Sequence, residues 1–365
     1  MKKVSIISMQ KVPNYGSFLQ AYALKQLLLK AGADSVDFLD IKKGRQILSV
    51  NKKTKLLNNL NVLLSGKIVS KLRTRRYLKI KEERFAPYYS YFSNNNPQDT
   101  MYDLAVIGSD EVFNCCQASS WGFSRQLMGD VENCRKAISY AASFGSTTMP
   151  MIEKYNLSAE IAECMGKLSS ISVRDDNSFN LVLKLTGKEP LKHLDPVLIY
   201  GYKEELEKDV DAVIPKENYM IVYTYAGRID NSKEIKSIKA FAKQNRLKLY
   251  SLFCKYDWCD GEIVPEHPLQ VPAVFKTAKY SVTDTFHGTI FSIISHTKFC
   301  TFVRNNNTQK LSSLLGGLGL SDRIVNKPES LASVIVNDIN YDEVERVLVE
   351  ERTRTNTYLS QSVNS

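Results

Sequence analysis

The sequence lacks a long apolar run, and this absence limits where the protein is expected to work. No stretch approaches the roughly 20 consecutive apolar residues that a membrane-spanning helix needs. The basic start, MKK, precedes an apolar part of only about five residues, which is too short for the core of a secretory signal peptide. We therefore expect a cytoplasmic protein.

The sequence also lacks the short motifs that mark several enzyme classes. It has no GxGxxG after its first expected strand, no Walker phosphate loop, no HExxH pair and no GxSxG. These absences disfavour a nucleoside triphosphatase, a zinc protease or a serine hydrolase. The seven cysteines include no CxxC pair and no nearby histidine cluster, so we expect reduced thiols and no metal site.

Positive charge is abundant but concentrated in one segment. The 365-residue chain has a formal charge of +10, whereas residues 42–84 alone carry +12, from fourteen Lys or Arg and two acids. This segment combines leucines with basic residues and is expected to be helical. One interpretation is a solvated helical insertion; the other is peripheral contact with the anionic inner face of the cell membrane. No nucleic-acid-binding motif accompanies the charge, so no nucleic-acid partner is expected.

Short β-branched strands alternate with helices along most of the chain. The first half has expected strands at residues 4–8, 35–41, 102–110, 136–145 and 170–176, with helices between them. A charged stretch at residues 201–217 follows, and the second half then repeats the rhythm with strands at 218–227, 247–254 and 298–303. This alternation predicts parallel sheets with right-handed crossovers.

The repeated pattern predicts an α/β protein of two Rossmann-like lobes facing a cleft, a GT-B-like arrangement, with C-terminal helices. The expected N-terminal lobe spans residues 1–205 and carries the basic helical insertion at about 42–84. The expected C-terminal lobe spans 206–327, and a helical tail spans 328–365.

Ligands of open α/β sheets bind at the carboxyl ends of strands, where helix N-termini favour anions. Four such corners carry candidate residues. The first is the loop NYGS, which contributes Asn14, Tyr15, Gly16 and Ser17. Gly16 permits close backbone approach, and Ser17 either caps the following helix or holds a ligand oxygen. A plain capped turn is the alternative.

The second and third corners carry charged candidates. Ser109 and Asp110 follow a buried strand, and Asp110 either orients a hydroxyl or caps the next helix. Arg174 follows another apolar strand, and its guanidinium suits a carboxylate or phosphate by paired hydrogen bonds. The alternative for Arg174 is a surface ion pair with Asp175 or Asp176.

The fourth corner, TDTFHGT, places His287 where an expected strand ends and a helix begins. A lone histidine is more often structural, but a histidine at this position can gain a proton when an anion binds and then donate it. Thr285, Gly288 and Thr289 flank it. The other histidines have weaker cases: His193, His267 and His296.

Five segments together resemble the polysaccharide pyruvyl transferase family: NYGSFLQAYAL, DLAVIGSDEVFN, ISVRDDNS, LDPVLI and TDTFHGTIFSIISHTKF. They occur in the family's order over about residues 4–305. The resemblance implies a GT-B-like fold and transfer of the enolpyruvyl unit of phosphoenolpyruvate to a sugar of a cell-surface polysaccharide or its lipid-linked precursor. It further implies a pyruvate ketal as product, release of phosphate, and no cofactor besides the phosphoenolpyruvate donor.

The resemblance also implies roles for single residues. His287 matches the family's candidate acid, Arg174 matches the arginine that holds phosphoenolpyruvate, and Asp110 is a candidate to orient the acceptor. The remaining predicted substrate-binding residues are Asn14, Tyr15, Gly16, Ser17, Ser109, Thr285, Gly288 and Thr289.

Thr285 departs from the arginine that some members carry two residues before the histidine, so a second anion contact must come from elsewhere or the donor differs. Two other functions therefore stay open. One is a GT-B glycosyltransferase that uses a nucleotide sugar, and the other is a non-catalytic glycan-binding subunit.

Overall fold

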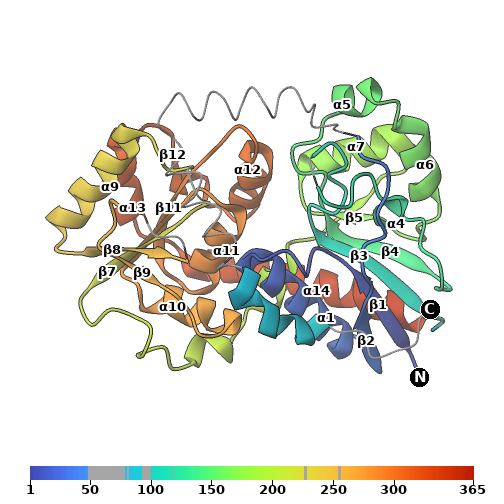
Figure 1. The fold of residues 1–365 in the computed structure, drawn as a ribbon, viewed down its shortest axis with the longest axis horizontal. Coiled ribbons are helices and arrows are strands. Elements are labelled where there is room, and N and C mark those ends of the chain that lie inside the picture. Colours follow the sequence, from blue (N-terminus) through green and yellow to red (C-terminus); the bar gives the residue numbers. More distant parts are fainter. Residues whose placement is uncertain (48–78, 80–81, 93–99, 118, 226–227, 254–255) are drawn as a thin grey trace.

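A computed structural model describes residues 1–47, 79, 82–92, 100–117, 119–225, 228–253 and 256–365. Most of the basic segment 42–84 lies outside these residues, so its expected helices and membrane contact stay predictions. The described chain forms two parallel six-stranded sheets, one in each of two lobes (Figure 1), as the sequence predicts.

The first sheet has the strand order β2-β1-β3-β4-β5-β6. Its register pairs Val4 with Val36 on one side and with Leu104 on the other. The strands are β1 (Lys3–Ile7), β2 (Ser35–Phe38), β3 (Leu104–Asp110), β4 (Ala137–Ala142), β5 (Ser172–Val173) and β6 (Leu191–Lys192). The helices around it are α1 (Tyr15–Lys30), η1 (Ala86–Phe92), α4 (Arg125–Met128), α5 (Met149–Lys154), α6 (Ser158–Gly166), α7 (Asp176–Thr186) and α8 (Pro196–Tyr200).

The second sheet has the order β12-β11-β10-β7-β8-β9. Its strands are β7 (Tyr219–Tyr223), β8 (Lys248–Leu252), β9 (Gly261–Ile263), β10 (Tyr280–Thr283), β11 (Lys298–Phe302) and β12 (Ile324–Val325). The α-helices are α9 (Ser232–Gln244), α10 (Val271–Thr277), α11 (Phe286–Ile294), α12 (Thr308–Gly317) and α13 (Leu331–Val336), and 3-10 turns are η2 (Glu205–Glu207), η3 (Pro268–Gln270), η4 (Ser321–Arg323) and η5 (Pro328–Ser330). The central strands β7 and β10 are buried nearly throughout, as expected when helices cover both faces of a parallel sheet.

The last helix, α14 (Tyr341–Asn364), connects the two lobes. Near its start, Tyr341 stacks on His296 of the C-terminal lobe with ring centroids 3.9 Å apart. Near its end, the Tyr358 hydroxyl donates a hydrogen bond to the Ser139 carbonyl in the first sheet, at 2.8 Å. Figure 1 shows this helix running under the N-terminal lobe, where both chain ends lie. The C-terminal helix therefore ties the lobes together.

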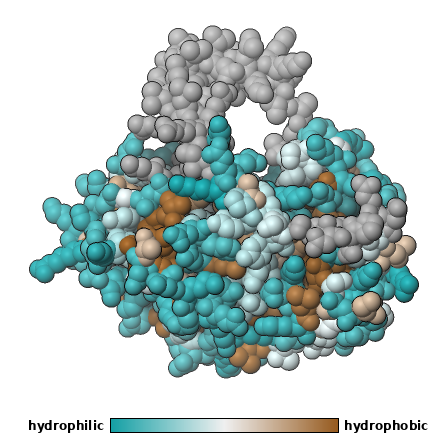
Figure 2. Space-filling model, turned by 60° about the horizontal axis from the view of Figure 1, so that its bottom comes forward, coloured by the Kyte–Doolittle hydropathy of each residue, from teal (hydrophilic) through white to brown (hydrophobic). Residues whose placement is uncertain are grey.

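A hydrophobic cluster continues from one lobe into the other. The Tyr15 ring meets Phe253 of the C-terminal lobe edge-on, with centroids 5.1 Å apart, and also contacts Phe85. On the face shown in Figure 2, hydrophobic residues form separate brown patches among hydrophilic ones. Among the described residues, no helix combines the length and apolar character needed to cross a membrane. The apolar side chains of the shared cluster pack the two lobes against each other.

Candidate active site

A cavity of about 260 Å³ lies between the lobes, at the carboxyl ends of both sheets. The N-terminal lobe contributes residues that end or follow β1, β3, β4 and β5: Met9, Val12, Asn14, Ser17, Asp110, Glu111, Asn114, Gln117, Ser146 and Arg174. The C-terminal lobe contributes residues that follow β7, β10 and β11: Tyr225, Arg228, Phe286, His287, Asn306, Asn307 and Lys310. Both lobes therefore present their strand ends to one shared space, as the rule for parallel sheets predicts.

Arg174 is buried at the cavity, with only 1% of its side chain exposed. Its Nη1 donates to Asp195 Oδ2 at 2.7 Å and its Nη2 donates to Asp110 Oδ1 at 3.3 Å. Burial alone would lower the pKa of Arg174, but these carboxylates raise it, so the guanidinium stays charged. The Nε atom is buried without a hydrogen-bond partner among the described residues. Arg174 is therefore not a surface ion pair, which was the alternative for it.

Asp110 ends β3 with a left-handed backbone, at φ 73°. Such a conformation is uncommon outside glycine and is typical of functional sites. Its Oδ2 accepts a hydrogen bond from Ser17 Oγ at 2.9 Å. Ser17 lies inside α1, whose cap is Asn14, because Asn14 Oδ1 accepts from the Gly16 N–H at 2.7 Å. Neither Ser17 nor Asp110 therefore caps a helix. The two side chains form a hydrogen bond with each other at the cavity.

His287 is the second residue of α11, two positions after the N-cap Thr285, whose hydroxyl accepts from the Gly288 N–H at 2.9 Å. Its Nε2 lies 3.6 Å from Asp195 Oδ2 and has no hydrogen-bond partner among the described residues. A Cβ atom on Gly16 would lie 2.2 Å from His287 Nδ1. Because Gly16 has no side chain, His287 of the C-terminal lobe can pack directly against α1 of the N-terminal lobe.

Asp195 contacts both Arg174 and His287, although it does not line the cavity. It caps α8 by accepting from the Val197 N–H at 3.1 Å, and its side chain is 0% exposed. Burial alone would raise the pKa of Asp195, but His287 and Arg174 hold it below the ordinary value. The Ser109 hydroxyl lies 3.4 Å from the same carboxylate. Asp195 is therefore an ionised group that positions Arg174 and His287 together.

Two further contacts cross the cleft. Lys310 of the C-terminal lobe pairs with Glu111 of the N-terminal lobe. Burial alone would raise the pKa of Glu111, but Lys310 lowers it to about 2. The Asn14 amide donates to the Tyr225 hydroxyl at 2.8 Å, and burial raises the pKa of Tyr225 to about 12. These contacts hold the two walls of the cavity together.

The structure brings together five of the residues predicted from sequence. Asn14, Ser17, Asp110, Arg174 and His287 all line the cavity. They come from four separate corners of the chain, and Arg174, Asp110 and Ser17 form one hydrogen-bonded chain. Their roles toward substrate stay predictions.

The other predicted substrate-binding residues do not line the cavity: Tyr15, Gly16, Ser109, Thr285, Gly288 and Thr289. Thr289 donates to the Thr285 carbonyl at 3.0 Å, inside α11. A Cβ on Gly288 would lie 2.2 Å from Thr283 Oγ1, so glycine allows the tight strand-to-helix corner. In the structure these residues build the corners that hold the lining side chains, and substrate contact by them stays a prediction.

The remaining histidines have local partners. His193 Nδ1 lies 2.8 Å from Ser172 Oγ, and burial lowers the pKa of His193 to about 4. His267 accepts the Leu269 N–H at 3.0 Å and caps a short 3-10 helix. His296 stacks on the first tyrosine of α14. Structural contacts account for all three.

Sequence reasoning missed several polar residues at or beside the cavity: Asp195, Glu111, Tyr225, Arg228 and Lys310. Asp195 carried a usable signal, because an aspartate directly before a proline is a typical start of a helix. Arg228 follows β7 in a loop, and Lys310 lies in the first turn of α12, after β11. The strand-end rule, that ligands bind at the carboxyl ends of parallel strands, marks both segments. It does not say which side chain of a loop faces the cavity.

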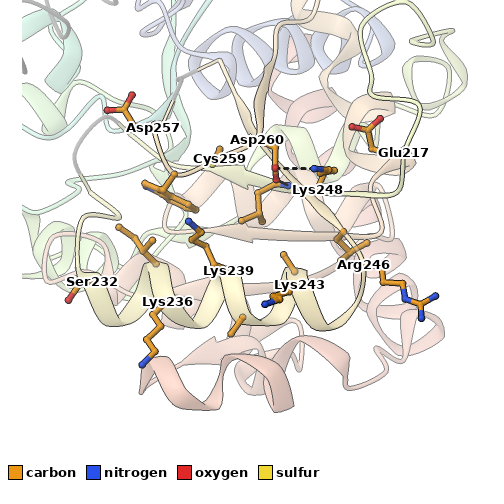
Figure 3. Close-up of a pocket in the computed structure, with 16 residues that line it drawn as sticks. Glu217, Ser232, Lys236, Lys239, Lys243, Arg246, Lys248, Asp257, Cys259 and Asp260 are labelled. Atoms are coloured by element: carbon orange, nitrogen blue, oxygen red, sulfur yellow. Dashed lines mark hydrogen bonds and ion pairs between the residues drawn. The ribbon is translucent and has the colours of Figure 1, made fainter.

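A second, larger groove of about 1130 Å³ lies on the C-terminal lobe beside α9 (Figure 3). Exposed basic residues of this helix and the turn after it line the groove: Lys236, Lys239, Lys243 and Arg246. Lys248 pairs with Asp260 at 3.4 Å, whereas Lys236 points away from the sheet in Figure 3. These side chains do not converge on one point, unlike those of the cleft.

Comparisons with known proteins agree with the fold and the corners. Among solved structures, UDP-GlcNAc 2-epimerase from Neisseria meningitidis, bound to UDP-GlcNAc, matches with a TM-score of 0.52 and 9% identity over 99% of each chain. The Methanocaldococcus jannaschii enzyme of the same name has a TM-score of 0.48 and 13% identity over 98% of this chain and 100% of its own. The first likeness shows a GT-B-like fold and nothing about substrate.

Among curated proteins, none matches the sequence. The model of the family described as polysaccharide pyruvyl transferase matches residues 14–306, which include all four corners. The matched stretch is most of the chain and contains every predicted site residue. The chain therefore belongs to the polysaccharide pyruvyl transferase family and is a transferase.

Proposed function

We propose that the protein transfers the enolpyruvyl unit of phosphoenolpyruvate to a sugar of a cell-surface polysaccharide or its lipid-linked precursor. The product is a cyclic pyruvate ketal, and phosphate is released without a further cofactor. The observation that supports this proposal is the cluster of His287, Asp195 and Arg174 at the cavity, in which the histidine Nε2 has no hydrogen bond among the described residues. An acid beside a fixed cation is what this reaction needs.

The proposed reaction starts with proton transfer from the His287 imidazolium to the methylene carbon of the donor. This step leaves a positively charged, oxocarbenium-like centre at C2. One sugar hydroxyl adds to C2, and its proton returns to the histidine. The bond from C2 to the phosphate oxygen then breaks, and a second hydroxyl adds to C2 while its proton leaves with the phosphate. Positioned acid catalysis of this kind contributes about 10²–10⁴-fold.

The surrounding residues support each step of the proposal. Buried and ionised, Asp195 attracts the imidazolium form of His287 and holds Arg174 in place. Arg174 offers its Nε to an anionic group of the donor. Asp110 has a carboxylate at the cavity wall, where it would orient an acceptor hydroxyl.

The size of the cavity favours a small donor over a nucleotide sugar. Pockets for drug-sized ligands have volumes of roughly 300–1,000 Å³. The cleft cavity, at about 260 Å³, lies below this range. Phosphoenolpyruvate and the edge of one sugar ring suit such a volume, whereas a nucleoside diphosphate sugar would require the lobes to separate and break the contact between Glu111 and Lys310.

Thermal unfolding in the presence of candidate donors tests the proposal. Phosphoenolpyruvate at millimolar concentration is expected to raise the melting temperature, whereas UDP-glucose and UDP-N-acetylglucosamine are not. Stabilisation by a UDP-sugar alone would favour a glycosyltransferase. Stabilisation by none of them would favour a glycan-binding subunit.

A lipid-linked acceptor would place the enzyme at the inner face of the cell membrane. The basic segment 42–84 would then contact the anionic surface, with each Lys or Arg contributing about 1 kcal/mol. Co-sedimentation with anionic vesicles at low salt, lost at high salt and absent with phosphatidylcholine vesicles, is the expected result. No sedimentation with anionic vesicles at low salt would contradict this part of the proposal.

A further inference from the structure

The donor of the proposed reaction has two anionic groups, a carboxylate and a phosphate. Among the described residues, three cationic side chains other than histidine line the cavity: Arg174, Arg228 and Lys310. Both terminal nitrogens of Arg174 already donate hydrogen bonds, one to Asp195 and one to Asp110. Lys310 is paired with Glu111. Two of the three cations are therefore largely neutralised by the protein itself.

Arg228 differs from the other two. It lies at the cavity in a half-buried position, and no ion pair joins it to a carboxylate of the described residues. Its guanidinium stacks over the Tyr225 ring at 4.6 Å from the centroid. Tyr225 is itself held by Asn14 across the cleft. Stacking on a fixed ring orients the planar guanidinium and leaves its N–H edge free for a ligand.

The two walls of the cavity also differ in charge. Asp110 and Glu111 lie on the N-terminal side, and Lys310 keeps the pKa of Glu111 low, so that this carboxylate is ionised. A phosphate dianion is repelled more strongly by that wall than a carboxylate is. Thr285 is an N-cap and does not line the cavity. On the C-terminal side, Arg228 is the cavity-lining arginine that no ion pair joins to a carboxylate among the described residues.

We infer that Arg228 binds the phosphate group of the donor. This inference rests on the proposed function and assigns a residue that the sequence pattern did not mark. Both N–H groups of one guanidinium edge can meet two phosphate oxygens. The carboxylate then lies toward Arg174 Nε, and the half-exposed Arg228 stands where the released phosphate leaves.

Calorimetric titration with phosphoenolpyruvate tests the inference. Arg228→Ala is expected to weaken binding at pH 7 by about ten- to a hundredfold, the range of a charge-assisted contact. Arg228→Lys should recover part of the affinity, because it restores the charge but not the planar edge. Arg246→Ala, an exposed arginine beside the outer groove, is the matched control and should bind like wild type.

Titration at pH 5 identifies the group that Arg228 contacts. A phosphate ester gains its second charge near pH 6, whereas the carboxylate is ionised at both pH values. The loss in Arg228→Ala should therefore be larger at pH 7 than at pH 5. Equal losses at both pH values, or no loss, would overturn the inference while the proposed function stands. If wild type binds no phosphoenolpyruvate at millimolar concentration, the proposed function is wrong and the inference falls with it.

Discussion

The cleft cavity and the outer groove of the C-terminal lobe differ in how they hold charge. The outer groove is larger, about 1130 Å³ against about 260 Å³, but the lysines of α9 beside it are exposed to solvent. In the cleft, Arg174 and Asp195 are almost fully buried and paired at 2.7 Å. Removing such charges from water costs several kcal/mol per ion. Buried and paired charge, more than volume, therefore distinguishes the candidate site.

The cleft also contains buried polar atoms that lack partners among the described residues. Arg174 Nε and His287 Nε2 are both of this kind. An unsatisfied buried donor or acceptor costs about 1–3 kcal/mol. Both atoms lie on side chains that line the same cavity, so a bound donor can supply the missing partners. The outer groove has no comparable pair of atoms in the described part of the chain.

The largest effect is expected from His287→Asn. Transfer should slow by about 10²–10⁴-fold, because the reaction loses its proton donor. Single-turnover phosphate release measures the rate, and far-UV circular dichroism checks the fold. His296→Asn, at a histidine with 53% of its side chain exposed, is the matched control and should keep the wild-type rate. If the transfer rate of His287→Asn falls by less than about tenfold, His287 is not the proton donor.

A smaller loss is expected from Asp195→Asn, which removes a positioning charge but no reacting group. The Asp195 carboxylate makes charge-assisted contacts with Arg174 and His287, and loss of such contacts is expected to slow transfer by about ten- to a hundredfold. Asp195→Glu keeps the negative charge and should recover part of the lost rate. A rate for Asp195→Asn within about twofold of wild type, or no recovery of rate in Asp195→Glu, would contradict positioning by this carboxylate.

Glu111→Gln tests the bridge between the lobes through stability. The pKa of Glu111 is about 2 in the folded protein, below its ordinary value of 4.5, so its ionised form stabilises the native state. This contribution, about 1–3 kcal/mol, is present above pH 4.5 and is lost as the pH falls toward 2. Thermal unfolding should therefore separate wild type from Glu111→Gln at pH 7 and much less at pH 3. An equal difference at both pH values would contradict the account.

The smallest effect is expected in the outer groove. Lys239→Ala and Lys243→Ala remove exposed charges of α9. Surface substitutions of this kind usually change stability by less than about 0.5 kcal/mol, and transfer should stay within about twofold of wild type. A loss of transfer rate as large as that of His287→Asn would contradict the assignment of the active site to the cleft cavity and not to the outer groove.

The strand-end rule allowed much of the site to be predicted. It marked Asp110, Arg174 and His287, which lie in separate parts of the sequence and meet at one cavity. It did not predict that Arg174 would be held by two carboxylates. That arrangement depends on how α8 places Asp195 between the lobes.

Other features of the site depend on packing that the sequence pattern does not contain. Thr285 occupies the position where some family members carry an arginine, and in the structure its hydroxyl caps α11 by accepting from the Gly288 N–H; substrate contact by Thr285 stays a prediction. The ring of Tyr15 packs against Phe253 of the other lobe, a contact that the sequence pattern does not show; substrate contact by Tyr15 stays a prediction. The position of Arg228 at the cavity depends on the packing of the two lobes, so the sequence alone did not indicate it as a site residue.

The most direct test of the central claim is transfer in deuterium oxide. Wild-type protein is incubated with phosphoenolpyruvate and methyl glycosides of glucose, galactose and mannose, and the products are examined by nuclear magnetic resonance. The account predicts a ketal whose new methyl group carries one solvent deuterium, delivered from the exchanged His287 imidazolium, and almost no such product with His287→Asn. A ketal methyl group without solvent deuterium, or equal product from both proteins, would contradict it.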